Sequence, residues 1–249
     1  MPWALDLDGV VWLDEQPIAG AAEAIAALRE ADEELVFCTN LSSRPVAEAE
    51  AKLARHGIPA LGAVVTSAMA AARLVEPGER VLVCAGPGVV EELTARGAVL
   101  VGEGEGDADV VMVGLHLDFD YAALRRAATT VRGGARLIGT NDDPTYPTPD
   151  GPIPGGGAIL AAVATASGVD PIVAGKPYAP MAELVRDRLG DHGTVVGDRA
   201  DTDGALARRL GYRFVLVLSG STCAADAAAA DADAIYPDLA TAVAAELAR

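Results

Sequence analysis

Two aspartates stand two residues apart near the start of the chain, Asp6 and Asp8 in the run WALDLDGVVW at residues 3–12. The apolar residues before them predict a short buried strand, and Gly9 permits a sharp turn after it. If that strand continues through them, both carboxylates face the same side of it. Like charges so close repel, and the pKa of one rises unless a cation or a proton lies between them. The pair indicates either a cation-dependent site or a solvated acidic turn.

Three further polar stretches follow other predicted strands. They are Thr39-Asn40, Gly175-Lys176-Pro177, and Gly197-Asp198 with Asp201 and Asp203. Each has a simpler explanation, since Thr39 could cap a helix, Lys176 could be solvated, and Asp203 could charge a helix start. Together, however, they would bring carboxylates, a hydroxyl and an ammonium to one edge of one sheet. Oxygen ligands of this kind suit Mg²⁺. The same groups are those that phosphoryl transfer requires.

A parallel α/β sheet would bring these loops together, because its ligands bind at the carboxyl ends of the strands. Short apolar runs alternate with helical stretches, which predicts such a sheet with helices on its faces. The predicted strands are 3–7, 35–37, 63–65, 80–84, 98–101, 109–113, 135–139, 171–174, 194–197 and 213–218. The predicted helices are 20–31, 45–55, 67–75, 89–96, 121–131, 158–167, 179–189 and 203–210. Segment 140–157 is typical of a turn-rich loop, and tract 224–234 of a loose helix or surface connection.

The Pro77-Gly78 pair predicts a domain boundary, because a second strand–helix alternation begins there. That alternation continues to residue 174, and the last polar stretches follow it. We therefore expect a discontinuous core at 1–77 and 175–249, interrupted by an inserted α/β domain at 78–174.

Composition excludes several classes of partner. The 249 residues carry 36 acids against 19 bases, a formal net charge of −17, which argues against nucleic acid and anionic membranes. Cys38, Cys84 and Cys223 are widely separated, as expected for free thiols in a reducing compartment. The longest apolar stretch, 158–166, is too short to span a bilayer, and no charged leader precedes an apolar run. We expect a cytoplasmic protein without nucleic-acid or membrane partners.

The polar motifs together resemble those of the haloacid dehalogenase (HAD) superfamily of phosphatases. The matching stretches, in order, are DLDGV at 6–10, CTN at 38–40, GKP at 175–177 and GDRADTD at 197–203. Three longer stretches are similar to the NagD-like, 4-nitrophenylphosphatase-like class IIA branch: TSAMAAARL (66–74), GTNDDPTYPTPDGPIPGGGAI (139–159) and GKPYAPM (175–181). The resemblance spans essentially the whole chain. It implies a Rossmann-like, doubly wound parallel core with an inserted α/β cap of class II, A type, that roofs the site and selects the leaving group.

The resemblance implies separate tasks for the two aspartates. Asp6 would be the nucleophile that forms an aspartyl-phosphate. Asp8 would be the general acid that protonates the leaving alkoxide and later deprotonates the attacking water. Dehalogenases lack an acid at the position of Asp8 because halide leaves without a proton. The pair therefore favours phosphate esters over carbon–halogen bonds.

The resemblance also implies a metal and a phosphate site. Mg²⁺ would be held by Asp6, the Asp8 carbonyl and Asp198, with Asp203 in support. Thr39, Asn40 and Lys176 would bind the phosphoryl oxygens, and Lys176 would also offset the charge of Asp6. One departure lies after Asn40, where the branch often has a second Asn and this chain has Leu41.

The substrate implied by the resemblance is a small phosphorylated metabolite such as phosphoglycolate, glycerol phosphate, a sugar phosphate or a nucleoside monophosphate. Candidate cap contacts to it are His116, Asn141, Asp143 and Tyr146. The resemblance also allows a homo-oligomer formed through the cap. Two alternatives stay open: a phosphotransferase or mutase, and a catalytically weak phosphometabolite-binding protein on the same fold.

Overall fold

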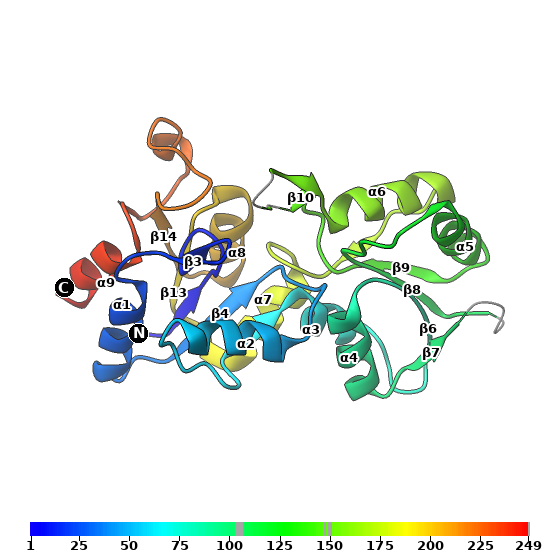
Figure 1. The fold of residues 1–249 in the computed structure, drawn as a ribbon, viewed down its shortest axis with the longest axis horizontal. Helices are drawn as coiled ribbons and strands as arrows, with labels where there is room; N and C mark the ends of the chain where they lie inside the picture. The colour runs from blue at the N-terminus through cyan, green and yellow to red at the C-terminus, as the bar shows by residue number, and fades with distance from the viewer. Residues whose placement is uncertain (103–106, 147, 149–150, 249) are drawn as a thin grey trace. The chain divides into compact units, whose positions relative to one another are not determined.

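The computed structural model describes residues 1–102, 107–146, 148 and 151–248 (Figure 1). The contacts along the chain divide it into two compact units. Unit 1 comprises Met1–Thr39, Ala47–Val65 and Lys176–Arg249, and unit 2 comprises Asn40–Val46 and Thr66–Gly175. Of the predicted motif at 139–159, residues 147, 149 and 150 lie outside the described residues.

Unit 1 is built on a six-stranded sheet in the order β15-β14-β13-β1-β4-β5. Its strands are β1 (Trp3–Leu5), β4 (Leu35–Thr39), β5 (Val64–Thr66), β13 (Thr194–Gly197), β14 (Arg213–Val217) and β15 (Ala234–Tyr236). The pairings of β1 with β4 and β13, and of β14 with β13 and β15, are parallel. Numbered along the chain, the order is 3-2-1-4-5-6, which is the doubly wound order of Rossmann-like sheets. It reverses between β1 and β13, the place where such sheets bind ligands.

Helices cover this sheet with small and apolar side chains. They are α1 (Ala21–Glu30), α2 (Val46–Arg55), α7 (Ala179–Leu189), α8 (Ala205–Leu210) and α9 (Leu239–Leu247). In α1 the buried residues follow the three- and four-residue spacing of one helix face: Ala21, Ala24, Ile25 and Leu28. The α1 and α9 helices pack together near both chain ends (Figure 1).

Unit 2 has its own five-stranded parallel sheet, in the order β12-β9-β8-β6-β7. The strands are β6 (Arg80–Cys84), β7 (Val99–Val101), β8 (Val110–Val113), β9 (Arg136–Gly139) and β12 (Ile172–Val173). The helices are α3 (Ser67–Ala72), α4 (Pro87–Arg96), α5 (Tyr121–Arg132) and α6 (Gly156–Ser167). Helices α5 and α6 pack against each other and against β8 (Figure 1), over an apolar core that includes Val111, Leu137 and Val163. An α/β fold with two parallel sheets confirms the predicted fold class.

The structure differs from the sequence-based expectation in several short elements. Two antiparallel hairpins were not predicted: β2 (Trp12–Leu13) with β3 (Gln16–Pro17), and β10 (Thr145–Tyr146) with β11 (Ile153–Pro154). The second lies in the segment expected to be an irregular loop. The alanine-rich tract contains a 3₁₀ turn, Ala227–Ala229, in place of a helix. Its last residue, Ala234, begins the unpredicted β15, which the unpredicted α9 follows. The helix expected at 203–210 begins as a π-helical turn at Ala200–Gly204.

Strand β1 ends at Leu5, before both aspartates. The expectation that Asp6 and Asp8 face the same side of one strand therefore does not apply. Gly9 turns the chain with a φ of 81°. Helix α3, expected in the first domain, contacts α4 within unit 2. None of the helices in the described part of the chain is long and apolar enough to cross a membrane.

Candidate active site

The reversal of strand order in unit 1 places two aspartates side by side. Leu5 of β1 lies opposite Val196 of β13, so the residues that follow these strands are neighbours. Asp6 continues the ladder by donating its backbone N–H to the Val196 carbonyl at 2.9 Å. Asp198 follows the end of β13. The carboxyl ends of β1 and β13 therefore bring Asp6 and Asp198 to the same sheet edge.

A buried lysine lies between two of the carboxylates of unit 1. The Lys176 ammonium is 2.7 Å from Asp6 Oδ1 and 2.8 Å from Asp203 Oδ1. Lys176 is 3% exposed and Asp203 is fully buried, so neither charge is solvated by bulk water. A buried ammonium needs partners of this kind, because an unpaired buried charge is strongly destabilising.

Three carboxylates in this cluster could share a cation. One oxygen each from Asp6, Asp198 and Asp203 lie within 4.8 Å of one another. Carboxylate oxygens are the ligands that Mg²⁺ takes from a protein while it keeps bound waters. The residues present therefore fit the metal that the sequence predicted.

Charge balance within the cluster also favours a cation. Burial raises the pKa of Asp6 well above its usual range, and the Lys176 ammonium only partly offsets this. Burial likewise raises the pKa of Asp203, again with Lys176 acting in the opposite direction. Burial disfavours the Lys176 ammonium too, but Asp203 and Asp6 outweigh that effect and hold its pKa well above the ordinary value. One ammonium thus serves more carboxylates than it can neutralise.

Glycines make room for the carboxylates. A Cβ on Gly197 would lie 2.2 Å from the Cβ of Asp203, and one on Gly9 would lie 2.5 Å from Asp198 Oδ2. The backbone N–H of Ser221 donates to Asp198 Oδ2 at 2.5 Å. Asp198 and Asp203 are therefore fixed by close backbone approach, which larger residues would prevent.

Asp8 has a different environment from Asp6. Its Oδ1 accepts a hydrogen bond from the indole N–H of Trp12 at 3.0 Å. The Lys52 ammonium lies 4.2 Å from the centroid of the Trp12 ring. Asp8 reaches solvent, yet desolvation by surrounding protein atoms raises its pKa, and the hydrogen bond from Trp12 acts the other way. The two aspartates thus have separate partners, Lys176 for Asp6 and Trp12 for Asp8.

Thr39 and Asn40 divide between the two units. Thr39 ends β4 in unit 1 and is 3% exposed. Asn40 belongs to unit 2, where its side-chain Nδ2 donates to Asp143 Oδ2 at 2.8 Å. Asn141 also contacts Asn40, since its Nδ2 donates to the Asn40 carbonyl at 2.9 Å.

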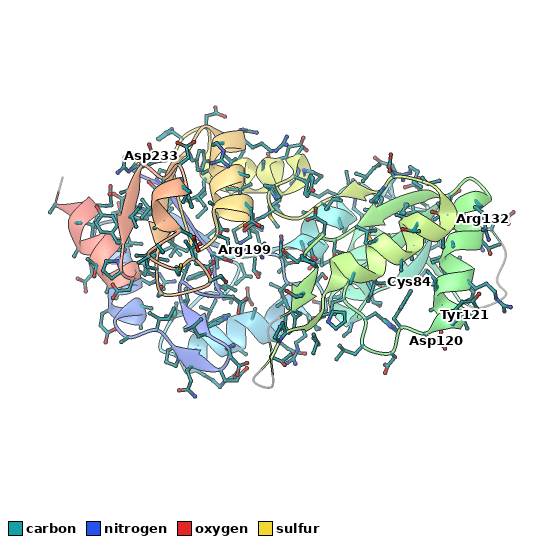
Figure 2. The ribbon with its side chains drawn as sticks, turned by 90° about the horizontal axis from the view of Figure 1, so that it is seen from above. Cys84, Asp120, Tyr121, Arg132, Arg199 and Asp233 are labelled. Carbon is teal, nitrogen blue, oxygen red and sulfur yellow. The ribbon has the colours of Figure 1, made fainter. Side chains whose placement is uncertain are left out.

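The remaining candidates are more dispersed. Tyr146 lies on β10 and is 36% exposed. His116 follows β8, and its Nδ1 is buried with no hydrogen-bond partner among the described residues. Asp201 stands outside the carboxylate cluster, because it pairs with Arg199, which Figure 2 labels, at 2.8 Å. The hydrogen bond from Arg199 lowers the pKa of Asp201.

Sequence reasoning missed three residues that hold the site: Trp12, Ser67 and Ser221. Trp12 ends the same motif as Asp8, and an indole four residues from an acid is a signal that could have found it. Ser67 donates to the Asn40 carbonyl at 2.7 Å, and Ser221 reaches Asp198 through its backbone. The distances in sequence, 27 and 23 residues, leave no local pattern for these two contacts.

Two family models match the chain. One, described as haloacid dehalogenase-like hydrolase, matches residues 3–99, and a second, described as HAD-hydrolase-like, matches residues 173–242. The chain is 40% identical to the D-glycerol 3-phosphate phosphatase of Mycobacterium tuberculosis, over 91% of this chain and 65% of that relative's length. It is 36% identical to human chronophin over 86% of this chain and 80% of chronophin.

Solved structures agree with this grouping. The p-nitrophenyl phosphatase from Archaeoglobus fulgidus superposes with a TM-score of 0.91 at 29% identity, covering 98% of each chain. A glycerol phosphate phosphatase from M. tuberculosis in complex with magnesium superposes with a TM-score of 0.89 at 37% identity, covering 96% of this chain and 75% of that one. The chain belongs to the haloacid dehalogenase-like hydrolases, in their NagD-like branch. The family resemblance drawn from the motifs is confirmed, and the relatives named here include phosphatases of small phosphate esters.

Proposed function

We propose that this chain is a Mg²⁺-dependent phosphatase that hydrolyses small phosphate monoesters through a phospho-aspartate on Asp6. One observation carries the proposal. The Asp6 carboxylate is 2.7 Å from the Lys176 ammonium, and its oxygen lies within 4.8 Å of oxygens of Asp198 and Asp203. A nucleophilic carboxylate, a cation for phosphoryl oxygens and a set of metal ligands are therefore gathered in one cluster of unit 1. Membership of a family with phosphatase relatives supports the same reaction.

Asp6 and Asp8 divide the covalent chemistry. An oxygen of Asp6 attacks phosphorus, and the bond between phosphorus and the ester oxygen breaks. Asp8 gives its proton to the departing alkoxide. Water then attacks the phosphorus of phospho-Asp6, Asp8 takes the water's proton, and inorganic phosphate leaves with Asp6 restored.

The other residues hold charge and position. Asp6, Asp198, Asp203 and the Asp8 carbonyl would hold Mg²⁺, which supplies positive charge for the carboxylates and the phosphoryl oxygens. Lys176 balances Asp6 before attack and binds a phosphoryl oxygen as charge moves onto it. The Thr39 hydroxyl, at the end of β4, donates to a second oxygen.

The units divide the work as well. We propose unit 1 as the catalytic core and unit 2 as the inserted cap, with the contact-defined boundaries in place of those expected at 77 and 174. The names of two relatives, a D-glycerol 3-phosphate phosphatase and an acid sugar phosphatase from Staphylococcus saprophyticus at 36% identity, point to phosphorylated polyols and sugars as the substrate class. A phosphate-release screen over such esters, with analysis of all phosphorylated products, identifies the substrate and separates hydrolysis from phosphotransfer.

The leaving-group dependence tests the role of Asp8. Asp8→Asn removes the proton donor, so kcat/KM, which reports formation of the phospho-aspartate, should fall more for glycerol 3-phosphate, whose alkoxide is a poor leaving group, than for 4-nitrophenyl phosphate, whose phenolate leaves without a proton. Removal of a general acid costs about 10²–10⁴-fold on the substrate that needs it. Equal losses of kcat/KM on both substrates would show that Asp8 does not act as the leaving-group acid.

Two finer statements stay predictions from composition and family. The acidic chain, with a net charge of −17, is expected in the cytoplasm without nucleic-acid partners. A homo-oligomer through unit 2 is tested by light scattering after gel filtration, with a unit 2 surface variant as the comparison.

A further inference from the structure

Each polar motif that links the two units joins a proposed site residue to a residue of unit 2. Thr39 of unit 1 is followed by Asn40 of unit 2, and Gly175 of unit 2 is followed by Lys176 of unit 1. Adjacent Cα atoms lie about 3.8 Å apart across a trans peptide. The position of Asn40 therefore limits the position of Thr39, and that of Gly175 limits Lys176.

Hydrogen bonds fix both the backbone carbonyl and the side-chain amide of Asn40. Its carbonyl accepts from Ser67 Oγ at 2.7 Å and from Asn141 Nδ2 at 2.9 Å. Its side-chain Nδ2 donates to Asp143 Oδ2 at 2.8 Å. The backbone N–H of Asp143 in turn donates to Asn141 Oδ1 at 3.2 Å, which closes a ring around Asn40. We call Ser67, Asn141 and Asp143 the Asn40 clamp.

Gly175 lies against the same clamp. A Cβ on Gly175 would lie 2.5 Å from Asn40 Oδ1, 2.7 Å from the Thr140 carbonyl oxygen and 3.1 Å from Ser67 Cβ. The two linking segments thus lie against each other within unit 2. Asn40 is the first residue after the chain leaves unit 1, and Gly175 is the last residue before the chain returns to it. The same set of contacts therefore fixes the positions of both Asn40 and Gly175.

We propose that the Asn40 clamp positions Thr39 and Lys176 for phosphoryl transfer, so that Asn141 and Asp143 are positioning residues for the reaction. This rests on the proposed phosphatase function and replaces the substrate contacts that the sequence suggested for these two residues. Asn141 is 5% exposed, and both its amide nitrogen and its amide oxygen are engaged within the clamp. Because both ends of this buried amide are held in fixed directions within the clamp, the structure favours a positioning role over contact with a substrate that changes from one ester to the next.

Uniform loss across substrates distinguishes positioning from substrate contact. Thr39 and Lys176 act on the phosphoryl group, which every ester shares. A disturbed clamp therefore lowers kcat/KM by the same factor for 4-nitrophenyl phosphate and for glycerol 3-phosphate. A residue that touches the leaving group instead changes their ratio.

The test compares three variants, each with Mg²⁺. Asp143→Leu keeps a side chain branched at Cγ, although a larger one, and removes the acceptor for Asn40. We expect a loss of about 10- to 100-fold on both esters, as for a small misplacement of catalytic groups. Asp143→Asn keeps an amide oxygen as acceptor, and its loss should stay within about threefold. The matched control is Asp142→Asn, an exposed neighbour outside the clamp that loses the same charge, and it should match the wild type.

Three results overturn the proposal. If Asp143→Asn loses as much activity as Asp143→Leu, the charge of Asp143 and not its hydrogen bond to Asn40 is what the reaction needs. A loss confined to one ester, or wild-type rates in Asp143→Leu, would mean that Asp143 does not position the phosphoryl site. Ser67→Ala, a smaller change that removes a donor to the same carbonyl, carries the test if Asp143→Leu does not fold, and wild-type rates there count against the clamp.

Calorimetric titration with inorganic phosphate and Mg²⁺ separates this proposal from the proposed function. Phosphate binds through the groups that the clamp positions, so Asp143→Leu should weaken its affinity by about tenfold, one misplaced hydrogen-bonding group. If the wild type binds phosphate but hydrolyses no ester, the proposed function fails while the clamp is still tested. If Asp143→Leu binds phosphate as the wild type does, the clamp fails whatever the activity.

Discussion

Replacement of Lys176 by methionine tests the charge balance of the site. Methionine has a similar length and no charge, so the variant leaves Asp6 and Asp203 buried without the ammonium that lies 2.7 and 2.8 Å from them. Removal of one partner of a buried ion pair costs about 3–5 kcal/mol. At about 2–4 °C per kcal/mol for a chain of this size, the melting temperature should fall by about 6–20 °C. Turnover should be lost as well, since Lys176 is proposed to bind the phosphoryl group.

The size of this loss should depend on pH in a definite direction. Burial already raises the pKa of Asp6 and Asp203, and Lys176 opposes that rise. Without Lys176 both pKa values rise further, so the folded variant binds protons more readily than its unfolded chain. Stability from such a group is fully present below the unfolded pKa of about 3.9 and is lost as pH rises through the folded pKa. The difference in melting temperature between variant and wild type should therefore be small in acid and increase as pH rises.

Thermal unfolding of metal-free protein across acidic to alkaline pH provides the assay. The double variant Lys176→Met/Asp203→Asn also removes one of the buried carboxylates left without a partner. Its melting temperature should therefore lie between those of Lys176→Met and the wild type, and it should have no activity. Arg186→Met is the surface control, because its partner Asp191 is 3.6 Å away with a side chain 92% exposed, and it should change stability by at most about 0.5 kcal/mol. An unchanged melting temperature at alkaline pH, or a gap that widens in acid, would refute the charge balance described here.

Two further predictions concern the carboxylate cluster. Gly197→Ala places a Cβ 2.2 Å from the Cβ of Asp203, so it should cost about 1–3 kcal/mol in urea unfolding, whereas Gly211→Ala, where nothing lies near, reports the strain of a positive φ alone. The absence of a measurable cost at Gly197 would show that the close approach is relieved. Mg²⁺ at 100 times its dissociation constant should stabilise the protein by about 2.7 kcal/mol at neutral pH. The gain should shrink in acid because protons compete for the carboxylates, and an undiminished gain in Asp198→Asn would place the metal elsewhere.

The sequence was sufficient for both sheets and for most of the helices. Buried parallel strands are continuous apolar runs, and segments such as Val110–Val113 and Arg213–Val217 stand out for that reason. The motif residues Asp6, Lys176, Asp198 and Asp203 could be selected because their chemistry is uncommon at strand ends. The strand order, which the alternation of elements does not fix, brings Asp6 and Asp198 together, and Lys176 and Asp203 reach them from a loop and a π-helical turn.

Other features depend on contacts that no local pattern records. The two-residue hairpins are too short to show a period, and the alanine-rich tract hid the strand and helix that follow it. For α9 the overlooked signal was Asp238, whose side chain accepts from the Thr241 N–H at 2.8 Å and caps the helix. The expected geometry of Asp6 and Asp8 relied on a strand that in fact ends at Leu5. The Asn40 clamp joins residues about 100 positions apart, 101 for Asn141 and 103 for Asp143.

Phosphorylation of Asp6 during turnover is tested directly by rapid acid quench followed by mass analysis of the N-terminal peptide. Asp8→Asn with 4-nitrophenyl phosphate should trap the intermediate, because the leaving group needs no proton while hydrolysis needs a base. We predict one phosphoryl group on the peptide that contains Asp6, and neither label nor turnover in Asp6→Asn. Turnover by a correctly folded Asp6→Asn would contradict a phospho-aspartate on Asp6. So would the absence of a labelled peptide in the Asp8→Asn trap when the wild type turns over.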